Sequence, residues 1–178
     1  MIPLRPALAL AVLLCIAFAS LSGCASTPPS KFYVLSSLQK QGPAKEASKP
    51  LATPVVAVGP VSMPDYLNRP QIVVRTSQNE LFLSEFDRWA GSFKADISRV
   101  VAEDVAVILN SQATVMMWTP MVHNSAPIET NVYVDIQRFE GTPGKEVMLQ
   151  ARWAITGKQW KEVKVVKDGD YREPISGN

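Results

Sequence analysis

The order of apolar and polar positions divides the chain into an apolar N-terminal segment, a tether and a region of short strands around one helix. The strand-like runs are rich in β-branched and aromatic residues and are bounded by Gly, Pro, Asn or Asp. They cover residues 31–35, 55–61, 71–76, 114–118, 131–139, 147–155 and 162–167. The run 55–61 is continuously apolar, which predicts a strand buried within the sheet.

The second half of the chain predicts an antiparallel meander. The runs 131–139 and 147–155 are separated by the turn residues Gly141-Thr142-Pro143-Gly144, which favour a hairpin. Residues 162–167 predict a third strand of this meander, which we expect to end at Asp168-Gly169.

One long amphipathic helix is predicted over residues 82–108. Positions on one face recur every three or four residues, which is the period of a helix. They are Phe82, Phe86, Trp89, Phe93, Ile97, Val100, Asp104 and Ile108. Ser84 and Asp87 resemble a capping box at its start. The predicted fold class is α/β (α+β): a small single domain with a mixed or antiparallel sheet packed by this helix.

The N-terminal segment has the layout of a secretory signal peptide. Arg5 precedes an apolar run from Ala7 to Ala19, and Leu21-Ser22-Gly23-Cys24 follows. This stretch is typical of a bacterial lipobox, in which the Cys thiol is acylated, the peptide is cleaved before it and the new amino group is acylated. The alternative is a membrane-spanning anchor, which needs about 20 apolar residues. The run from Ala7 to Ala19 is too short for that. We therefore predict lipidation of Cys24.

The residues after Cys24 indicate which membrane the lipid anchor occupies. Two lipid signals give stable membrane attachment. An Asp directly after the Cys usually retains a lipoprotein in the inner membrane, whereas this chain has Ala25 and Ser26. We therefore expect attachment to the outer membrane, facing the periplasm. The predicted organisation is a signal peptide over residues 1–23, a tether over 24–30 and a domain over 31–178.

Charge and cysteine content exclude several classes of function. The chain has 18 basic and 16 acidic residues, a formal net charge of +2. This balance argues against a nucleic-acid-binding protein, which would carry a basic stripe. Cys15 lies in the signal peptide, so no cysteine is left in the domain to act as a nucleophile or metal ligand. We predict neither a metal site nor a cofactor.

Candidate catalytic residues are few. His123 lies near Ser125 and is the chain's one histidine, but we expect an exposed loop there rather than a Ser–His pair. Asp65, beside Pro64, favours a turn over acid chemistry. The sequence contains neither a GxSxG nor an HExxH motif. We therefore predict that the protein is not an enzyme.

A resemblance to a known family rests on several features in a fixed order. The run Phe32-Tyr33-Val34-Leu35 follows the lipobox, and the segment VGPVSMPDYLNRPQIVVRT covers residues 58–76. The helix that bears Trp89 comes next. Together these features resemble the ABC-type transport auxiliary lipoprotein family over roughly residues 24–170.

The resemblance implies a fold and a set of partners. Family members are periplasm-facing lipoproteins with a small α/β domain, and they work with MCE-domain proteins and an ABC transporter in lipid traffic. They usually continue into a C-terminal amphipathic helix, where this chain stops at residues 171–178. We therefore expect that helix to be missing, through truncation or natural absence. One sheet face is then expected to expose Val147, Leu149 and Trp153.

The connection from Met63 to Pro70 is the strongest candidate for a partner-binding surface. Tyr, Met and Arg are enriched at interfaces, and loops on a rigid scaffold often carry binding. We expect Tyr66 and Leu67 to anchor in a partner pocket with Arg69 at the rim. The alternative is a turn that merely joins two strands.

The tryptophans divide into two groups. Trp89 and Trp153 follow the apolar phase of their elements, which predicts packing in the core. Trp118 and Trp160 lie near strand ends, and we treat both as candidate partner contacts.

Three functions follow from these observations. The first is a lipid-anchored accessory that docks an MCE-domain protein of an ABC transport system at the outer membrane and supports lipid transport. The second is a lipid-binding carrier with an apolar cavity beneath the sheet. The third is an envelope hydrolase, which His123 alone does not support. The sequence leaves open whether the chain forms a homo-oligomer.

Overall fold

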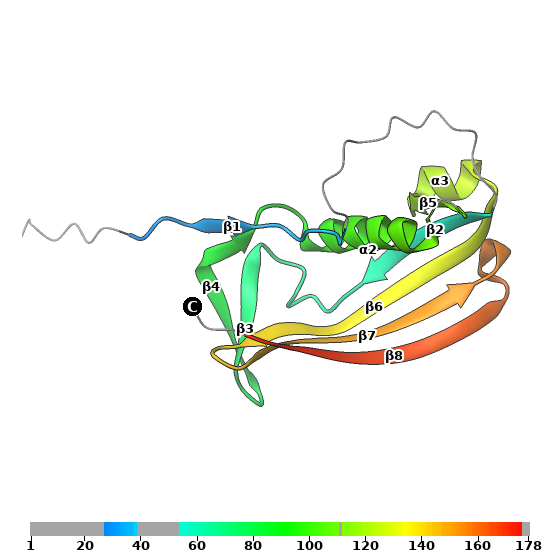
Figure 1. Ribbon diagram of the computed structural model, residues 1–178. Coiled ribbons are helices and arrows are strands. Elements are labelled where there is room, and N and C mark those ends of the chain that lie inside the picture. Colours follow the sequence, from blue (N-terminus) through cyan, green and yellow to red (C-terminus); the bar gives the residue numbers. More distant parts are fainter. Residues whose placement is uncertain (1–26, 39–53, 111, 176–178) are drawn as a thin grey trace, which may run out of the picture.

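The computed structural model describes residues 27–38, 54–110 and 112–175. In these residues eight strands form one mixed sheet, and helix α2 (Phe93–Leu109) lies along one side of it (Figure 1). The strands are β1 (Lys31–Tyr33), β2 (Val55–Ser62), β3 (Gln71–Ser77), β4 (Glu80–Trp89), β5 (Thr114–Met117), β6 (Ile128–Thr142), β7 (Glu146–Thr156) and β8 (Val163–Pro174).

The strand order combines parallel and antiparallel pairing. It runs β1-β4-β3-β6-β2-β5, and β7 and β8 continue from β6 as an antiparallel meander. β2 pairs in parallel with both β5 and β6. The prediction of a small single domain with a mixed sheet is confirmed.

Strand β2 forms the buried centre of the sheet, as its continuous apolar run predicts. Val55, Ala57 and Val58 have no exposed surface. Helix α2 packs against β2 and β5. Its buried residues Phe93 and Ile97 join Val61 of β2 in the hydrophobic core.

The helix prediction is correct from Phe93 onward and wrong before it. Residues 80–89 form β4, which pairs antiparallel with β3. The register shifts between Gln71 and Val73 of β3, so part of β4 is irregular and lacks the strict alternation of a strand. The apolar positions there consequently satisfy a helical spacing that the chain does not adopt.

The capping residue is also different from the predicted one. Ser84 does contact Asp87, and the backbone N–H of Asp87 donates to Ser84 Oγ at 3.0 Å, but both residues lie within β4. β4 ends at Trp89, and after it the Ser92 side chain accepts from the backbone N–H of Ala95 at 3.3 Å. This bond makes Ser92 the N-cap of α2.

The predicted hairpin is confirmed and its strands are longer than predicted. β6 reaches Thr142, and the N–H of Lys145 donates to the Thr142 carbonyl at 3.0 Å in the turn. The predicted end of the third strand is wrong. Gly169 pairs with Ala151 inside β8, which continues to Pro174.

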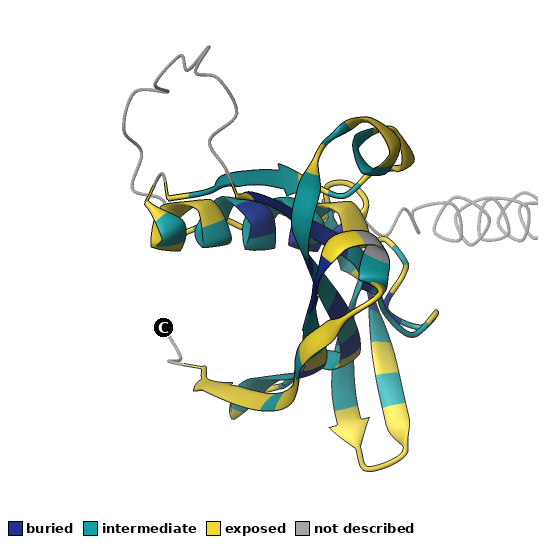
Figure 2. Ribbon diagram, turned by 90° about the vertical axis from the view of Figure 1, so that its right-hand side faces the viewer, coloured by how far each residue is buried: buried dark blue, intermediate teal, exposed yellow. Residues whose placement is uncertain are grey.

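Burial decreases across the meander, from β6 to its last strand β8. Figure 2 shows α2 and β8 at opposite ends of a curved sheet, with most of β8 exposed. β6 and β7 lie between them and are mostly half-buried. The sheet is therefore well covered at β2 and poorly covered at β8.

Candidate functional site

The connection from Met63 to Pro70 is a compact turn fixed on the sheet. The N–H of Leu67 donates to the Pro64 carbonyl at 2.9 Å, and the backbone N–H of Asn68 donates to the Asp65 carbonyl at 3.2 Å. Leu67 is 2% exposed and belongs to the core. The prediction that Leu67 anchors in a partner pocket is therefore wrong for this conformation, because the residue is an anchor to its own domain.

The buried carboxylate of Glu140 also holds this connection in place, through Tyr66. Glu140 of β6 has a side chain only 1% exposed. Arg75 Nε donates to its Oε1 at 2.6 Å, and Arg138 contacts the same oxygen at 2.8 Å. The Tyr66 hydroxyl donates to Oε2 at 3.2 Å. A carboxylate this deeply buried needs such partners to stay ionised.

The ionisation of this cluster follows from its contacts. Burial by itself would raise the pKa of Glu140, but the hydrogen bonds from Arg75 and Arg138 outweigh burial and lower it. Burial and the neighbouring negative charge of Glu140 raise the pKa of Tyr66. Tyr66 is therefore a neutral hydrogen-bond donor to a charged acceptor at physiological pH.

Arg69 completes the connection. Its side chain is half-buried, and its Nε is buried without a hydrogen-bond partner in the described residues. The predicted grouping of Tyr66 and Arg69 on one short segment stands. What the sequence did not reveal is the Glu140 cluster, since Arg75 of β3 reaches Glu140 of β6 only through the pairing of these two strands.

Trp118 lies elsewhere, at the end of β5. Its backbone N–H donates to the Val58 carbonyl at 2.8 Å, and its ring centroid lies 6.1 Å from that of His123. His123 belongs to the short helix α3 (Pro120–Ser125), which is capped by Thr119, so the predicted exposed loop is wrong. Met117 and Met121 nearby are exposed.

Trp160 is separated from both groups. It lies in the short 3-10 helix η1 (Lys158–Trp160) and has a positive φ of 63°. Asn131, at the start of β6, bonds to the neighbouring Gly157, whereas Tyr66 bonds to Glu140 near the end of β6. Those two positions are about 30 Å apart along an extended strand. The five predicted contact residues therefore do not form one surface.

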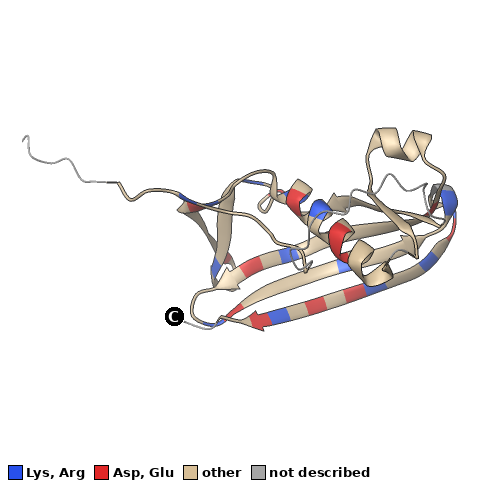
Figure 3. Ribbon diagram, turned by 45° about the horizontal axis from the view of Figure 1, so that its top comes forward, with Lys and Arg blue, Asp and Glu red and all other residues tan. Residues whose placement is uncertain are grey.

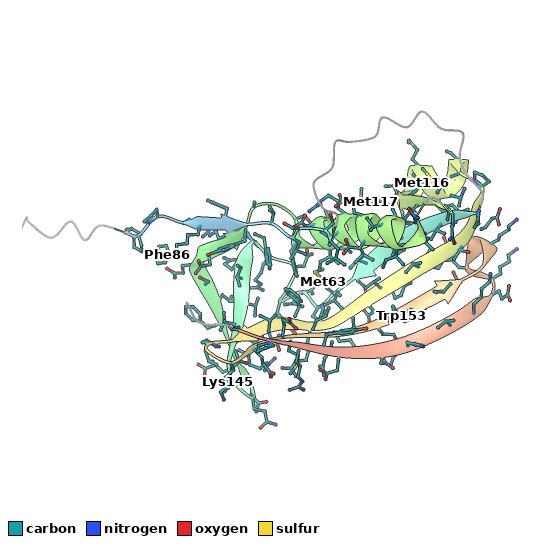
Figure 4. The ribbon with its side chains drawn as sticks, in the orientation of Figure 1. Met63, Phe86, Met116, Met117, Lys145 and Trp153 are labelled. Carbon is teal, nitrogen blue, oxygen red and sulfur yellow. The ribbon has the colours of Figure 1, made fainter. Side chains whose placement is uncertain are left out.

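An entirely apolar groove lies between α2 and the meander. Its volume is about 340 Å³, and its lining has no polar surface. Ile97, Val100 and Val101 contribute one face of α2, at the spacing of a helix. Figure 4 labels Trp153 on β7, which lines the groove from the sheet.

Three cross-strand rows form the floor of the groove. They are Phe139–Leu149–Tyr171, Ile136–Ala151–Gly169 and Val134–Trp153–Lys167. The middle row ends in Ala and Gly, so a hollow remains between two rows of larger side chains. A Cβ at position 169 would lie 2.4 Å from the Tyr171 ring, so only glycine lets that ring lie so close.

The sequence found part of this groove. The prediction of an apolar sheet face named Leu149 and Trp153, and both line it in half-buried positions. Val147 lies instead in a smaller hollow beside Leu67. Tyr171 and Gly169 were missed because the last strand was predicted to end before them.

Cys24 lies outside the described residues. No helix in the described part of the chain is long and apolar enough to cross a membrane. Across residues 27–38, 54–110 and 112–175, no group of three or more His, Cys, Asp or Glu side chains is placed to hold a metal ion.

Comparison with known proteins agrees with this architecture. Protein XCC0632 from Xanthomonas campestris, of the DUF330 family, has a similar fold in its crystal structure. The TM-score is 0.60 at 16% identity, over 83% of this chain and 80% of that one. The crystal structure of an uncharacterised protein is similar, with a TM-score of 0.59 at 15% identity and the same two coverages.

Sequence comparison gives the family. No curated protein matches the chain. The sequence model of one family matches residues 33–178, which is most of the chain and all the strands after β1. The chain belongs to the family of ABC-type transport auxiliary lipoprotein components.

Proposed function

We propose that this protein is a lipid-anchored accessory subunit that docks an MCE-domain protein of an ABC transport system at the outer membrane and supports lipid transport between membranes. Family membership is the observation that carries the proposal, because it makes the chain an auxiliary lipoprotein of ABC-type transport. The lipobox that ends in Cys24 supplies the anchor, and Ala25 and Ser26 favour the outer membrane.

The docking surface that we propose is centred on Tyr66 and Arg69. Loops on a rigid scaffold are suited to binding, and this loop is fixed by Leu67 in the core and by the Tyr66–Glu140 hydrogen bond. A surface held in place before binding loses little conformational entropy on binding. Tyr66 remains half-buried, so part of its ring is accessible to a partner.

Trp118 and Trp160 belong to separate contacts in this proposal. Trp118 lies beside His123 of α3, and Met121 of the same helix is exposed and adaptable in shape. Trp160 lies at the opposite end of the meander from the hairpin turn. A partner that meets Tyr66 reaches these residues only if it is large or if a second copy of the partner binds.

The anchor is tested by fractionating membranes. Cys24→Ala should abolish acylation and leave an uncleaved precursor in the inner membrane. Ala25→Asp should keep the acylation but move the protein toward the inner membrane on a sucrose gradient. An outer-membrane location of the Cys24→Ala protein would contradict the proposed anchor, and an unchanged location of the Ala25→Asp protein would contradict the proposed sorting.

Docking is tested by measuring the affinity of the intact lipoprotein for the MCE-domain protein of the same bacterium. Tyr66→Ala should weaken binding by about 2 kcal/mol, roughly thirtyfold. Phe82→Ala is the matched control, since Phe82 is an aromatic residue on β4 that is 55% exposed, and it should leave the affinity unchanged. Equal affinities for both variants and the parent would exclude Tyr66 from the interface.

A further inference from the structure

Three exposed apolar residues lie just after the tether, at the start of the folded domain. Phe32 of β1 is 64% exposed, and Val34 and Leu38, which follow β1, are 65% and 78% exposed. The stretch from Phe32 to Leu38 contains no charged residue, whereas charged residues recur along α2 and β8 (Figure 3). Neighbouring apolar side chains left exposed on a folded domain commonly mark a binding surface. We call Phe32, Val34 and Leu38 the outward row.

Helix α2 fixes the backbone of the outward row. The N–H of Leu35 donates to Asp96 Oδ2 at 2.6 Å, and Arg99 Nη2 donates to the Leu35 carbonyl at 2.7 Å. The N–H of Leu38 donates to Asp104 Oδ1 at 2.7 Å. The three partners all belong to α2. A segment held in this way loses little conformational entropy when it makes a contact.

The outward row is separate from the groove between α2 and the meander. Leu35 is half-buried and lines that groove. Its neighbour Val34 lines a different hollow of about 430 Å³, together with Trp89 and Met117. Val34 and Leu35 therefore face different sides of the segment. The exposure of Val34 does not depend on what covers the meander.

The length of the tether limits how far the outward row can lie from the lipid anchor. Seven residues separate Cys24 from Phe32, so the extended chain between them spans at most about 29 Å. Strand β6 alone has 15 residues and is about 50 Å long. Figure 1 shows β1 and the start of β8 at opposite ends of the molecule. An acylated Cys24 therefore keeps β1 near the bilayer, while the start of β8 can lie well away from it.

We propose that the outward row contacts the bilayer that holds the lipid anchor, with its three apolar side chains in the head-group region. Membrane-surface binding scales with the apolar area that enters this region. The short tether makes the contact intramolecular, so even a weak contact is populated. The inference rests on the proposed lipid anchor and goes beyond it, because it gives the folded domain a membrane contact of its own and thereby a fixed orientation.

The experiment uses the acylated lipoprotein in vesicles of phosphatidylcholine and phosphatidylglycerol. Removal of the signal peptide takes away Cys15 and acylation occupies Cys24, so an introduced cysteine is the one free thiol. Val34→Cys and the matched control Val163→Cys each carry the same fluorophore, since these valines are 65% and 61% exposed. A phosphatidylcholine with a nitroxide high on its acyl chain should quench the fluorophore at position 34 and leave that at position 163 unquenched.

Quenching at position 34 that is no greater than at position 163 would overturn the inference, because the row would then face water or a protein. Mass spectrometry of the same sample distinguishes this result from a failed anchor. A protein without the acyl mass rejects the proposed anchor and this inference with it. An acylated protein without quenching at position 34 rejects this inference alone and leaves the anchor standing.

Substitutions elsewhere in the outward row test its apolar character. In the protein labelled at position 34, Phe32→Ser should lower the equilibrium constant for bilayer contact about tenfold, which is measured as a loss of quenching. Val166→Ser changes an exposed valine of β8 and should leave quenching unchanged. If Phe32→Ser disturbs β1, Leu38→Ser lies outside that strand and decides. Unchanged quenching in Phe32→Ser and Leu38→Ser would also overturn the inference.

Discussion

Strands β2 and β8 belong to one sheet and have opposite environments. In β2, Val55, Ala57 and Val58 have no exposed surface, and α2 packs against the strand. In β8, only Val165 and Gly169 are even half-buried. β2 has neighbours on both of its edges, whereas β8 pairs with β7 alone. One strand thus forms the core, and the other forms a border.

The outer face of β8 is charged, whereas on its inner face Lys167 and Glu173 flank Gly169 and Tyr171. On the outer face Arg152 pairs with Asp168 at 2.8 Å, and Gln150 donates to Asp170 at 2.8 Å. Charges of this kind protect an edge strand from pairing with another chain. The inner face adds Tyr171 to the groove. The comparison therefore separates residues that stabilise the fold from residues that remain free for binding.

The largest difference is expected between two aromatic residues. Phe93 is 2% exposed and stacks on Trp89 with ring centroids 4.3 Å apart, whereas Tyr171 is 55% exposed. Phe93→Ala should lower the free energy of unfolding by about 3–5 kcal/mol because it leaves a cavity in the core. Tyr171→Ala should lower it by less than about 1 kcal/mol. Urea denaturation of the full-length protein measures both.

A large loss of unfolding free energy for Tyr171→Ala would contradict the contrast between β2 and β8. It would mean that β8 contributes to the core as much as α2 does. A small loss for Phe93→Ala would show that the start of α2 is not packed as described.

The second difference is expected between two carboxylates. Glu140→Gln removes the buried negative charge and one of the two acceptor oxygens, so Arg75 and Arg138 lose their counter-charge, which should cost about 3 kcal/mol. Asp168→Asn removes one member of an exposed pair on β8 and should produce no resolvable change in stability.

The pH dependence of this loss has a definite sign. The pKa of Glu140 is lowered in the folded protein from its ordinary value of 4.5. Its stabilising effect is therefore fully present above about pH 4.5 and is lost as the pH falls through the folded-state pKa. The difference between the parent and Glu140→Gln should be constant near neutral pH and should shrink in acid. A difference that grows in acid would contradict the ionised state of Glu140.

The sequence predicted the strands that have simple patterns. β2 is continuously apolar, and β6 and β7 alternate around a Gly/Pro turn, so local pattern and tertiary environment agree. β4 was mistaken for helix because its irregular register breaks the alternation. The prediction ended β8 at Asp168-Gly169, because glycine commonly ends a strand. In the structure Gly169 lies within β8, where it makes room for the Tyr171 ring.

The candidate sites were harder to predict than the strands. Tyr66 and Arg69 are three residues apart in the sequence and were predicted together. The Glu140 cluster joins β3 and β6 across a separation of 65 residues, and the groove joins α2 to β7 and β8. Such sites depend on which strands become neighbours, and a single sequence does not specify that order.

The smallest difference is expected between two valines, and it tests the comparison most directly. Val58 on β2 has no exposed surface, whereas Val166 on β8 is 53% exposed. Val58→Ala removes two buried methyl groups and should cost about 2 kcal/mol, from the lost apolar burial and the small cavity. Val166→Ala removes the same atoms from a face already in water and should change stability by less than about 0.5 kcal/mol. Because the chemical change is identical, any difference in intrinsic strand propensity is largely shared, and the contrast reports burial. If the two valines cost the same, the outer face of β8 must be covered in solution, and this face would have to be assigned to an interface between chains.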